Sequence, residues 1–259
     1  MSPPVLLVDI GNTSVTLGLA RGMRIGGVMR VPTAGAPAAL RAALRDLARG
    51  RRMGGAALCS VVPGLDRRCI GLVRDVAGAD PVVVTHRSPL GIGIDYPHPE
   101  TIGADRLVNA AAAAARWGAP AIVADFGTAL TFDVVSRAGN YVGGVIAPGL
   151  PMMTDYLAER TALLPRIDLK GGHGAVGRST AAAMRLGARY GYRGMVREIT
   201  AHVRQQPGMR NAALCATGGF ARWVLKDLDL PFRIEPNLTL NGLLHIFRLA
   251  ATGHGANGD

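Results

Sequence analysis

Aromatic residues are scarce in this chain of 259 residues, where they make up only 5% of the sequence. Hydrophobic residues nevertheless reach 49%, so a sizeable core is expected, built mainly from Ala, Val, Leu and Ile. Charged residues account for 18%, a composition that argues against wholesale disorder. The small number of aromatic side chains also argues against a protein that stacks nucleic-acid bases on its surface.

Cysteine is also rare. Cys59, Cys69 and Cys215 have no Cys-x-x-Cys spacing, which argues against a structural zinc site and fits a reducing compartment. The first residues lack a basic segment, and the first apolar stretch reaches Asp9 too soon for a signal peptide. No apolar run reaches the ~18 residues that a membrane span needs. We therefore expect a cytoplasmic protein that does not enter a membrane.

Acidic residues are outnumbered by basic ones, 18 against 29, which gives a formal net charge of +11. One explanation is nucleic-acid binding. The other is a basic proteome or a basic rim around an anionic substrate site. The arginines are scattered and no nucleic-acid recognition motif is present, so we favour the second explanation and expect no specific nucleic-acid partner.

Strand and helix patterns alternate along the first half of the chain. Val5–Val8 and Val15–Leu19 predict two strands joined by a turn at Gly11–Ser14. Leucines at helical spacing predict a helix over Ala36–Ala48. Three further segments predict a strand, a helix and a strand in turn: AALCSVVP, RCIGLVRDVAG and PVVVTH. This alternation indicates an α/β domain with a mixed sheet.

An alanine-rich segment predicts the next helix, which runs to about Trp117 and for which Thr101 is the expected N-cap. We place the boundary between two halves after this helix, with residues 1–117 in the first half and 118–259 in the second. The second half contains a helix-rich stretch from Ser179 to Val203 and a final helix near Leu240–Ala250.

The most informative feature is a repeated strand end. VLLVDIGNTSVTLGLA (5–20) runs from an apolar strand into Asp9, then a glycine and small polar residues, and then a second apolar run. AIVADFGTALTFDVV (121–135) repeats this order around Asp125, and ALCATGGFA (213–221) is a weaker echo. Two such hairpins in similar contexts suggest a duplicated architecture, with one copy in each half.

Such a turn can present several backbone N–H groups to phosphate oxygens. The hydroxyl groups of Thr13, Ser14 and Thr128 can add donors. Asp9 and Asp125 would repel bare phosphates, so they make sense where cations lie between them and the phosphates. A plain hairpin with an Asx-type turn is the alternative for either copy alone.

Asp105 stands apart, at the junction between a Gly/Pro-rich loop and the alanine-rich helix. A carboxylate at a helix N-terminus is electrostatically favoured, which is one explanation. The other is a general base that receives a hydroxyl proton during phosphoryl transfer. Arg106, its neighbour, could then hold an anionic group of the substrate, because arginine pairs bidentately with carboxylates.

Taken together, several stretches resemble type III pantothenate kinase over about residues 5–250. They occur in the order typical of that family: DIGNTSVTLGL, YPHPETIGADRLVNA, DFGTALTFDV, GNYVGGVIAPGL, TALLP, VGRSTAAAMRLGARYG, ATGGFA and LTLNGL. Any one of these motifs is weak, and their shared order carries the resemblance. The family more often has a small residue at the position of Leu130, a difference that we expect to be absorbed by repacking of the core.

The resemblance implies a duplicated actin/Hsp70/sugar-kinase-like α/β fold, with two related halves, mixed sheets and an active-site cleft between them. It implies ATP-dependent phosphorylation of pantothenate to 4'-phosphopantothenate, the first step of coenzyme A biosynthesis. It also implies a homodimer that needs Mg²⁺ with ATP and a monovalent cation, K⁺ or NH₄⁺. Two alternatives stay open: another small-molecule kinase or phosphatase of the same fold, and a non-enzymatic basic regulatory protein.

The resemblance also assigns site residues. Asp105 matches the catalytic base, Asp125 matches the ligand of the monovalent cation, and Asp9 is placed near Mg²⁺. The ATP-binding positions are Asp9, Ile10, Gly11, Asn12, Thr13, Ser14, Val15, Thr16 and Thr128. The pantothenate-binding positions are Tyr96, Gly103, Ala104, Arg106 and Thr180, the last of which reaches the site from the side of the partner subunit.

Overall fold

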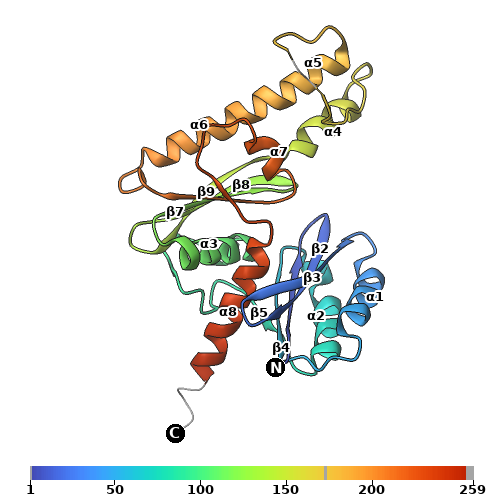
Figure 1. Ribbon diagram of the computed structural model, residues 1–259, viewed down its shortest axis with the longest axis vertical. Coiled ribbons are helices and arrows are strands. Elements are labelled where there is room, and N and C mark those ends of the chain that lie inside the picture. Colours follow the sequence, from blue (N-terminus) through green and yellow to red (C-terminus); the bar gives the residue numbers. More distant parts are fainter. Residues whose placement is uncertain (1, 172–173, 255–259) are drawn as a thin grey trace. The chain divides into compact units, whose positions relative to one another are not determined.

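The computed structural model describes residues 2–171 and 174–254, which form two compact units. Unit 1 holds the described parts of residues 1–118, 139–142 and 237–259, and unit 2 holds those of 119–138 and 143–236. The predicted division differs from these units at the C-terminal end. The last helix, α8 (Leu238–His254), belongs to unit 1 because it packs against the strands and the third helix of that unit (Figure 1).

Unit 1 contains a five-stranded sheet in the order β3-β2-β1-β4-β5. Its central strand β1 pairs antiparallel with β2 and parallel with β4. The strands are β1 (Val5–Ile10), β2 (Ser14–Arg21), β3 (Arg24–Pro32), β4 (Gly55–Ser60) and β5 (Val82–Val83). The apolar run that precedes Asp9 is therefore buried on both faces, as expected for a central strand.

Helices pack on the sheet of unit 1 from both faces, because successive side chains of a strand point to opposite faces. Leu6, Val8 and Ile10 face the core formed with α1 (Ala36–Ala48) and α2 (Pro63–Ala77). Asp9 alternates with them and so points to the opposite face. Helix α8 packs on β1 and β4 and also contacts α3 (Ala104–Trp117).

Unit 2 repeats this sheet in the order β11-β10-β7-β8-β9. The strands are β7 (Ala121–Phe126), β8 (Ala129–Val135), β9 (Asn140–Pro148), β10 (Ala213–Thr217) and β11 (Arg233–Ile234). The first residues of β9, which belong to unit 1, pair with β6 (Gly93–Ile94). The helices are α4 (Leu150–Arg160), α5 (Thr180–Leu186), the π-helical η2 (Gly187–Gly191), α6 (Tyr192–Arg204) and α7 (Ala221–Leu225).

The two sheets share their strand directions as well as their order. β7 pairs antiparallel with β8 and parallel with β10, as β1 does with β2 and β4. Asp9 lies opposite Thr16 and Asp125 lies opposite Thr131, so the register around each carboxylate is also repeated. This repetition confirms the duplication predicted from the two Asp-x-Gly stretches.

Several local predictions are confirmed and one is wrong. Helix α1 spans the predicted residues, and the alanine-rich helix α3 ends at Trp117. Thr101, however, is not the N-cap of α3, because Gly103 holds that position and Thr101 ends a short 3-10 helix, η1 (Pro99–Thr101). Its hydroxyl donates instead to the carbonyl oxygen of His98 at 2.7 Å. In residues 2–171 and 174–254, no helix is long and apolar enough to cross a membrane.

Candidate active site

The first turn, between β1 and β2, is fixed by backbone hydrogen bonds. Gly11 N–H donates to the carbonyl oxygen of Ser14 at 3.1 Å and closes the turn. Thr33 then holds it from the neighbouring strand end: its hydroxyl donates to Gly11 O at 2.6 Å, and its N–H donates to Thr13 O at 3.0 Å. Thr33 thus holds the carbonyl groups of Gly11 and Thr13. The side chains of Asn12 and Thr13 are exposed at the tip of the turn.

Asp9 lies beside the buried thiol of Cys59. The two residues are paired in the parallel register of β1 and β4, and the thiol donates to Asp9 Oδ1 at a sulfur–oxygen distance of 3.5 Å. Burial raises the pKa of Cys59 well above its usual value, and the charges of Asp9 and Asp105 raise it further. The thiol therefore stays protonated as a donor, and both carboxylates lie within electrostatic range of it.

Asp105 lies in the first turn of α3, where its carboxylate accepts the N–H of Arg106 at 2.8 Å. Burial raises the pKa of Asp105 above its usual value, while the hydrogen bond and the charge of Arg106 oppose the shift. A Cβ atom on Gly103 would lie 2.7 Å from Asp105 Oδ1, so this carboxylate position depends on a glycine at the N-cap. A buried carboxylate with a raised pKa is well suited to accept a proton.

An aromatic and cationic cluster adjoins Asp105 in the same unit. The guanidinium carbon of Arg106 lies 5.9 Å from the ring centroid of the buried Tyr141, and the rings of Tyr96 and Tyr141 meet edge to face at 6.2 Å. Asp95 N–H donates to Tyr141 O at 2.9 Å, which holds the two segments together. The sequence predicted Tyr96 and Arg106 as substrate contacts but missed Tyr141, although it lies in the quoted GNYVGG motif.

The second turn, between β7 and β8, is packed against other backbone. Gly127 N–H donates to Ala129 O at 3.1 Å, and Thr128 is exposed. A Cβ atom on Gly149, the N-cap of α4, would lie 1.9 Å from Thr128 O and 2.6 Å from Gly127 O. The N-cap of α4 is therefore held directly against the turn, a contact that the sequence did not predict.

Asp125 has two close neighbours in unit 2, the glycine Gly218 and the buried Tyr192. A Cβ atom on Gly218 would lie 2.6 Å from Asp125 Oδ1, and Gly218 has a positive φ of 91°, so the loop after β10 approaches the carboxylate closely only with glycine there. Burial raises the pKa of Tyr192, and the charge of Asp125 raises it further, which places this phenol near the carboxylate. Leu130, one strand position beyond the turn, is buried in the core of unit 2.

Unit 2 has a cavity of about 380 Å³ beside α4. Helix α4 contributes Pro151, Thr154 and Asp155 to its wall, and Phe220 and Trp223 contribute aromatic rings. Phe220 N–H donates to Phe126 O at 3.3 Å, so the segment that carries these rings is tied to the end of β7. Helix α4, whose N-cap meets the turn at Thr128, therefore also lines this cavity.

The predicted site residues fall into two groups, one in each unit. Unit 1 holds Asp9, its turn, Asp105 and the cluster of Tyr96 and Arg106. Unit 2 holds Asp125 and Thr128. Thr180 is also in unit 2, as the exposed first residue of α5, whose N-cap Ser179 accepts the N–H of Ala182 at 3.2 Å.

Metal binding by these residues would use few protein ligands. Within the described part of the chain, no three His, Cys, Asp or Glu side chains come together as a metal cage. Asp9 alone still fits Mg²⁺, which proteins usually hold through one or two carboxylates together with substrate phosphates. Asp125 offers a second carboxylate, in unit 2, that could serve a monovalent cation.

Comparison with known proteins connects this geometry to one family. The sequence profile described as type III pantothenate kinase matches residues 5–202. The type III pantothenate kinase of Akkermansia muciniphila is 46% identical over 200 residues, which cover 77% of this chain and 81% of the relative. The chain belongs to the type III pantothenate kinase family. Another member, from Moorella thermoacetica, is 36% identical and covers 94% of this chain and 98% of its own length.

Solved structures support the fold assignment. A Baf family protein of Campylobacter jejuni matches with a TM-score of 0.63 at 16% identity and covers 95% of this chain and 99% of its own. An inorganic polyphosphate/ATP-glucomannokinase from an Arthrobacter species matches with a TM-score of 0.51 at 17% identity and covers 97% and 100%. The predicted fold class, a duplicated α/β fold of the actin and sugar-kinase type, is confirmed. In this kinase family, ATP-dependent phosphoryl transfer needs a divalent metal.

Proposed function

We propose that this chain transfers the γ-phosphoryl group of ATP to the terminal hydroxyl group of pantothenate, the first step of coenzyme A biosynthesis. The observation that carries the proposal is the position of Asp105. Its carboxylate is buried at the start of α3, has a raised pKa, and lies within electrostatic range of the same thiol as Asp9 in the first turn. The carboxylate that we propose as the base and the turn that we propose for phosphate binding lie in the same unit, which supports a role in phosphoryl transfer.

The two turns bind the phosphates of ATP in this proposal. The segment Asp9–Thr16 and Thr128 offer backbone N–H groups and hydroxyl groups, which are suitable donors for phosphate oxygens. Asp9 would hold Mg²⁺ and Asp125 would hold K⁺ or NH₄⁺, and these cations would offset the negative charge of the phosphates. The closed turns reduce the reorganisation that substrate binding demands.

Asp105 acts as the general base. As the hydroxyl oxygen of pantothenate forms a bond to the γ-phosphorus, the bond from that phosphorus to the β–γ bridging oxygen breaks and ADP leaves. The hydroxyl proton passes to a carboxylate oxygen of Asp105. Burial favours this transfer, because it raises the proton affinity of the carboxylate.

Arg106 and the two tyrosines bind the acceptor. Gly103 and Ala104 bring the helix N-terminus close to it, and the guanidinium group of Arg106, held over Tyr141, pairs with the carboxylate of pantothenate. We expect the substitution Arg106→Gln to raise the KM for pantothenate about 10- to 100-fold, since a charge-assisted pair is lost, while the KM for ATP changes little. Initial rates at varied concentrations of each substrate measure both values.

Arg116→Gln is the matched control for that substitution. Arg116 also lies on α3 and stacks on an aromatic ring, that of Trp117 at 5.1 Å, but at the far end of the helix. Its removal is expected to leave both KM values unchanged. If Arg106→Gln raised the KM for ATP as much as that for pantothenate, the role of Arg106 in acceptor binding would be wrong.

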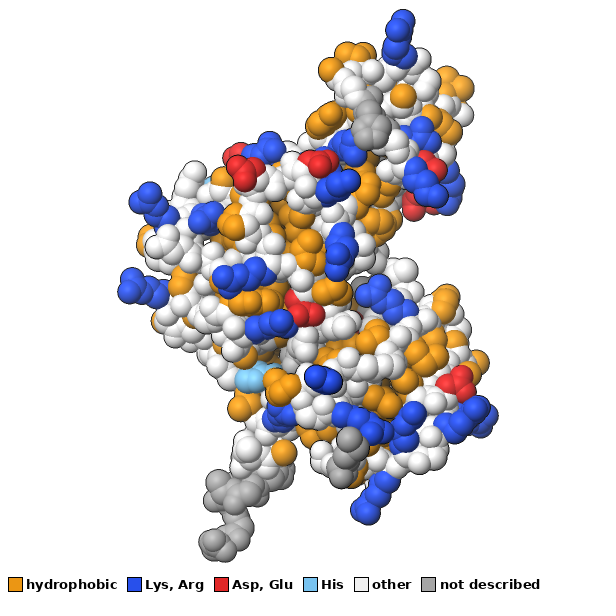
Figure 2. All heavy atoms as spheres, viewed as in Figure 1, with side chains coloured by type: hydrophobic (Ala, Val, Ile, Leu, Met, Phe, Trp, Pro, Cys, Tyr) orange, Lys and Arg blue, Asp and Glu red, His pale blue; other side chains and the backbone are white. Residues whose placement is uncertain are grey.

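We further propose a homodimer formed through unit 2, in which Thr180 of one protomer completes the site of its partner. Leu163 and Val176 are 88% and 79% exposed, and Met152, Tyr156 and Leu157 are exposed on α4. Figure 2 shows apolar side chains gathered at the end of unit 2 that carries α4 and α5. Such a patch favours association. Sedimentation velocity of the full chain and of a Leu163→Glu variant tests this, and a monomeric wild type would contradict it.

The activity itself is tested by ATP consumption with pantothenate, Mg²⁺ and either K⁺ or Na⁺. We expect turnover with pantothenate and K⁺, much slower turnover with Na⁺, and none with glycerol or hexoses. Phosphorylation of a sugar instead of pantothenate would favour another kinase of the fold. Steep salt-dependent DNA binding without kinase activity would favour a regulatory protein. Against that alternative, the basic side chains are spread over the face drawn in Figure 2 and do not form one patch.

The three free, buried cysteines support our placement of the reaction in the cytoplasm, which cell fractionation can test.

A further inference from the structure

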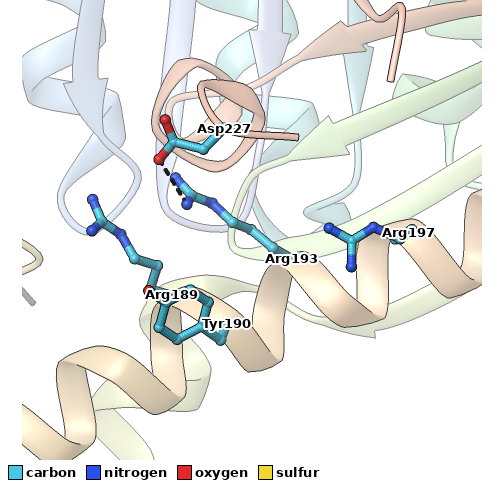
Figure 3. Close-up of a pocket in the computed structure, with 5 residues that line it drawn as sticks. All are labelled: Arg189, Tyr190, Arg193, Arg197 and Asp227. Atoms are coloured by element: carbon cyan, nitrogen blue, oxygen red, sulfur yellow. Dashed lines mark ion pairs between the residues drawn. The ribbon is translucent and has the colours of Figure 1, made fainter. Parts of the chain in front are cut away.

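A second cavity in unit 2, of about 330 Å³, contains none of the residues that we assign to phosphoryl transfer. Five residues line it: Arg189, Tyr190, Arg193, Arg197 and Asp227. Four of them come from η2 and α6, and Asp227 follows α7 (Figure 3). The cavity volume is in the range of pockets that hold small ligands.

Arg193 forms a fixed floor for this cavity. It is only 6% exposed, and its guanidinium group pairs with Asp227 Oδ2 at 2.8 Å. It also donates to Val224 O and Trp223 O, both at 3.0 Å, and lies 5.4 Å from the ring centroid of Trp223. A buried arginine held by three acceptors and a ring has one orientation, so together with Asp227 it gives the cavity a preformed, charge-paired floor.

Arg189 and Arg197 flank this floor on the same helix, four residues to either side. Figure 3 shows the Arg193 side chain extending from the helix to Asp227, with Arg189 on one side of it and Arg197 on the other. Three arginines face one aspartate among the five lining residues, which gives them a formal charge of +2.

The helix is locally widened at this position. Residues Gly187–Gly191 form a π-helical turn between α5 and α6, and Arg189 and Tyr190 lie within it. Such single π turns are frequent at functional sites. Tyr190 is 55% exposed and presents its ring at the cavity rim. The cavity therefore offers guanidinium groups for an anion and an aromatic face for an organic group.

We propose that this cavity is a binding site for a small phosphate-bearing molecule with at least two negative charges. Planar guanidinium groups bind phosphate oxygens bidentately, and Arg189 and Arg197 bring two such groups to one cavity. Arg189 and Arg197 contact the anion, Arg193 and Asp227 hold the floor, and Tyr190 packs against the rest of the ligand. The site is separate from the nucleotide site of the proposed function and does not depend on it.

Inorganic pyrophosphate serves as the probe. Isothermal titration is performed on the full chain with the nucleotide site filled by a non-hydrolysable ATP analogue, so that pyrophosphate reports on the second site. We expect wild type to bind pyrophosphate. Because the binding is ionic, it should weaken as KCl is raised from about 50 to about 150 mM, a range in which salt screens surface charges. The double variant Arg189→Gln/Arg197→Gln is expected to bind at least about tenfold more weakly, because charge-assisted hydrogen bonds are lost.

Arg210→Gln is the matched control, because Arg210 is an exposed arginine of unit 2 outside the cavity. It should bind pyrophosphate as wild type does. Thermal unfolding checks that the double variant folds, and pantothenate phosphorylation without pyrophosphate should match wild type in both variants. The proposal is overturned if wild type does not bind the probe, or if the double variant binds it equally well. It is also overturned if the double variant turns a dimer into a monomer, since the arginines would then contact a second copy.

Discussion

Asp105→Asn is expected to reduce kcat about 10²- to 10⁴-fold, the range that a positioned general base contributes. The substitution keeps the shape of the side chain, and the amide oxygen can still accept the N–H of Arg106. It removes only the ability to take up the hydroxyl proton. Steady-state rates with saturating ATP and pantothenate measure the loss, and near-normal KM values would show that both substrates still bind.

The same substitution should stabilise the fold at neutral pH. Burial raises the pKa of Asp105 above 3.8, its usual value, so the folded protein favours the protonated carboxyl group. The contribution of the Asp105 carboxyl group to the free energy of unfolding is therefore fully favourable below pH 3.8, and it is lost as the pH rises through the raised pKa. Above the raised pKa the ionised buried carboxylate is a cost that asparagine lacks, and the gain in unfolding free energy should vanish as the pH falls toward 3.8.

These two expectations together distinguish a catalytic carboxylate from a structural one. A helix-terminal aspartate that only stabilises α3 would lower the melting temperature when replaced and leave turnover almost intact. In wild type, kcat/KM should rise with pH through the pKa of Asp105, at a higher pH than an ordinary aspartate would give. A variant that turned over at the wild-type rate would exclude Asp105 as the base.

The local parts of this fold were readable from the sequence. The alanine content predicted α3, and the leucine spacing predicted α1. The apolar runs before Asp9 and Asp125 predicted β1 and β7. Each of these signals lies within a few neighbouring residues, where propensity and periodicity act directly. The repeated Asp-x-Gly order also indicated the duplication, because it compares two such local signals.

The parts that were missed depend on residues far apart in the chain. Tyr141 reaches Arg106 and Tyr96 only because β9 pairs with β6, and no local pattern gives that pairing. Likewise, α8 joins unit 1 because of the strands and helix on which it packs, not because of its own sequence. Arg189, Arg193 and Arg197 show a spacing of four in the sequence, but Asp227 completes their cavity from another segment.

Gly149 shows the same limit at the second turn. Its φ of −68° is open to any residue, so no turn preference marks it as essential. Its importance comes from contact: an added Cβ would lie 1.9 Å from Thr128 O and 2.5 Å from Thr128 C. Both are backbone atoms in a hydrogen-bonded turn, which cannot rotate away as a flexible side chain would.

We therefore expect Gly149→Ala to displace either the turn at Thr128 or the start of α4. Because Thr128 is a proposed ATP-binding position, we expect the variant to raise the Kd for ATP at least about tenfold. Overpacking of this kind typically costs about 1–3 kcal/mol of stability. In a Trp117→Phe background, the fluorescence of Trp223 reports binding of an ATP analogue, measured well below the melting temperature of the variant.

Gly194→Ala is the matched control for this test. Gly194 lies in α6 of the same unit, and an added Cβ would meet nothing within 4 Å. Alanine in a helix is favoured over glycine by about 1 kcal/mol, so this variant should melt at a higher temperature and bind nucleotide normally. If Gly149→Ala instead bound the analogue as tightly as Gly194→Ala, the packing of α4 against Thr128 would have no part in nucleotide binding. If both variants bound weakly, unit 2 would be sensitive to any added methyl group and the contact at Gly149 would not be special.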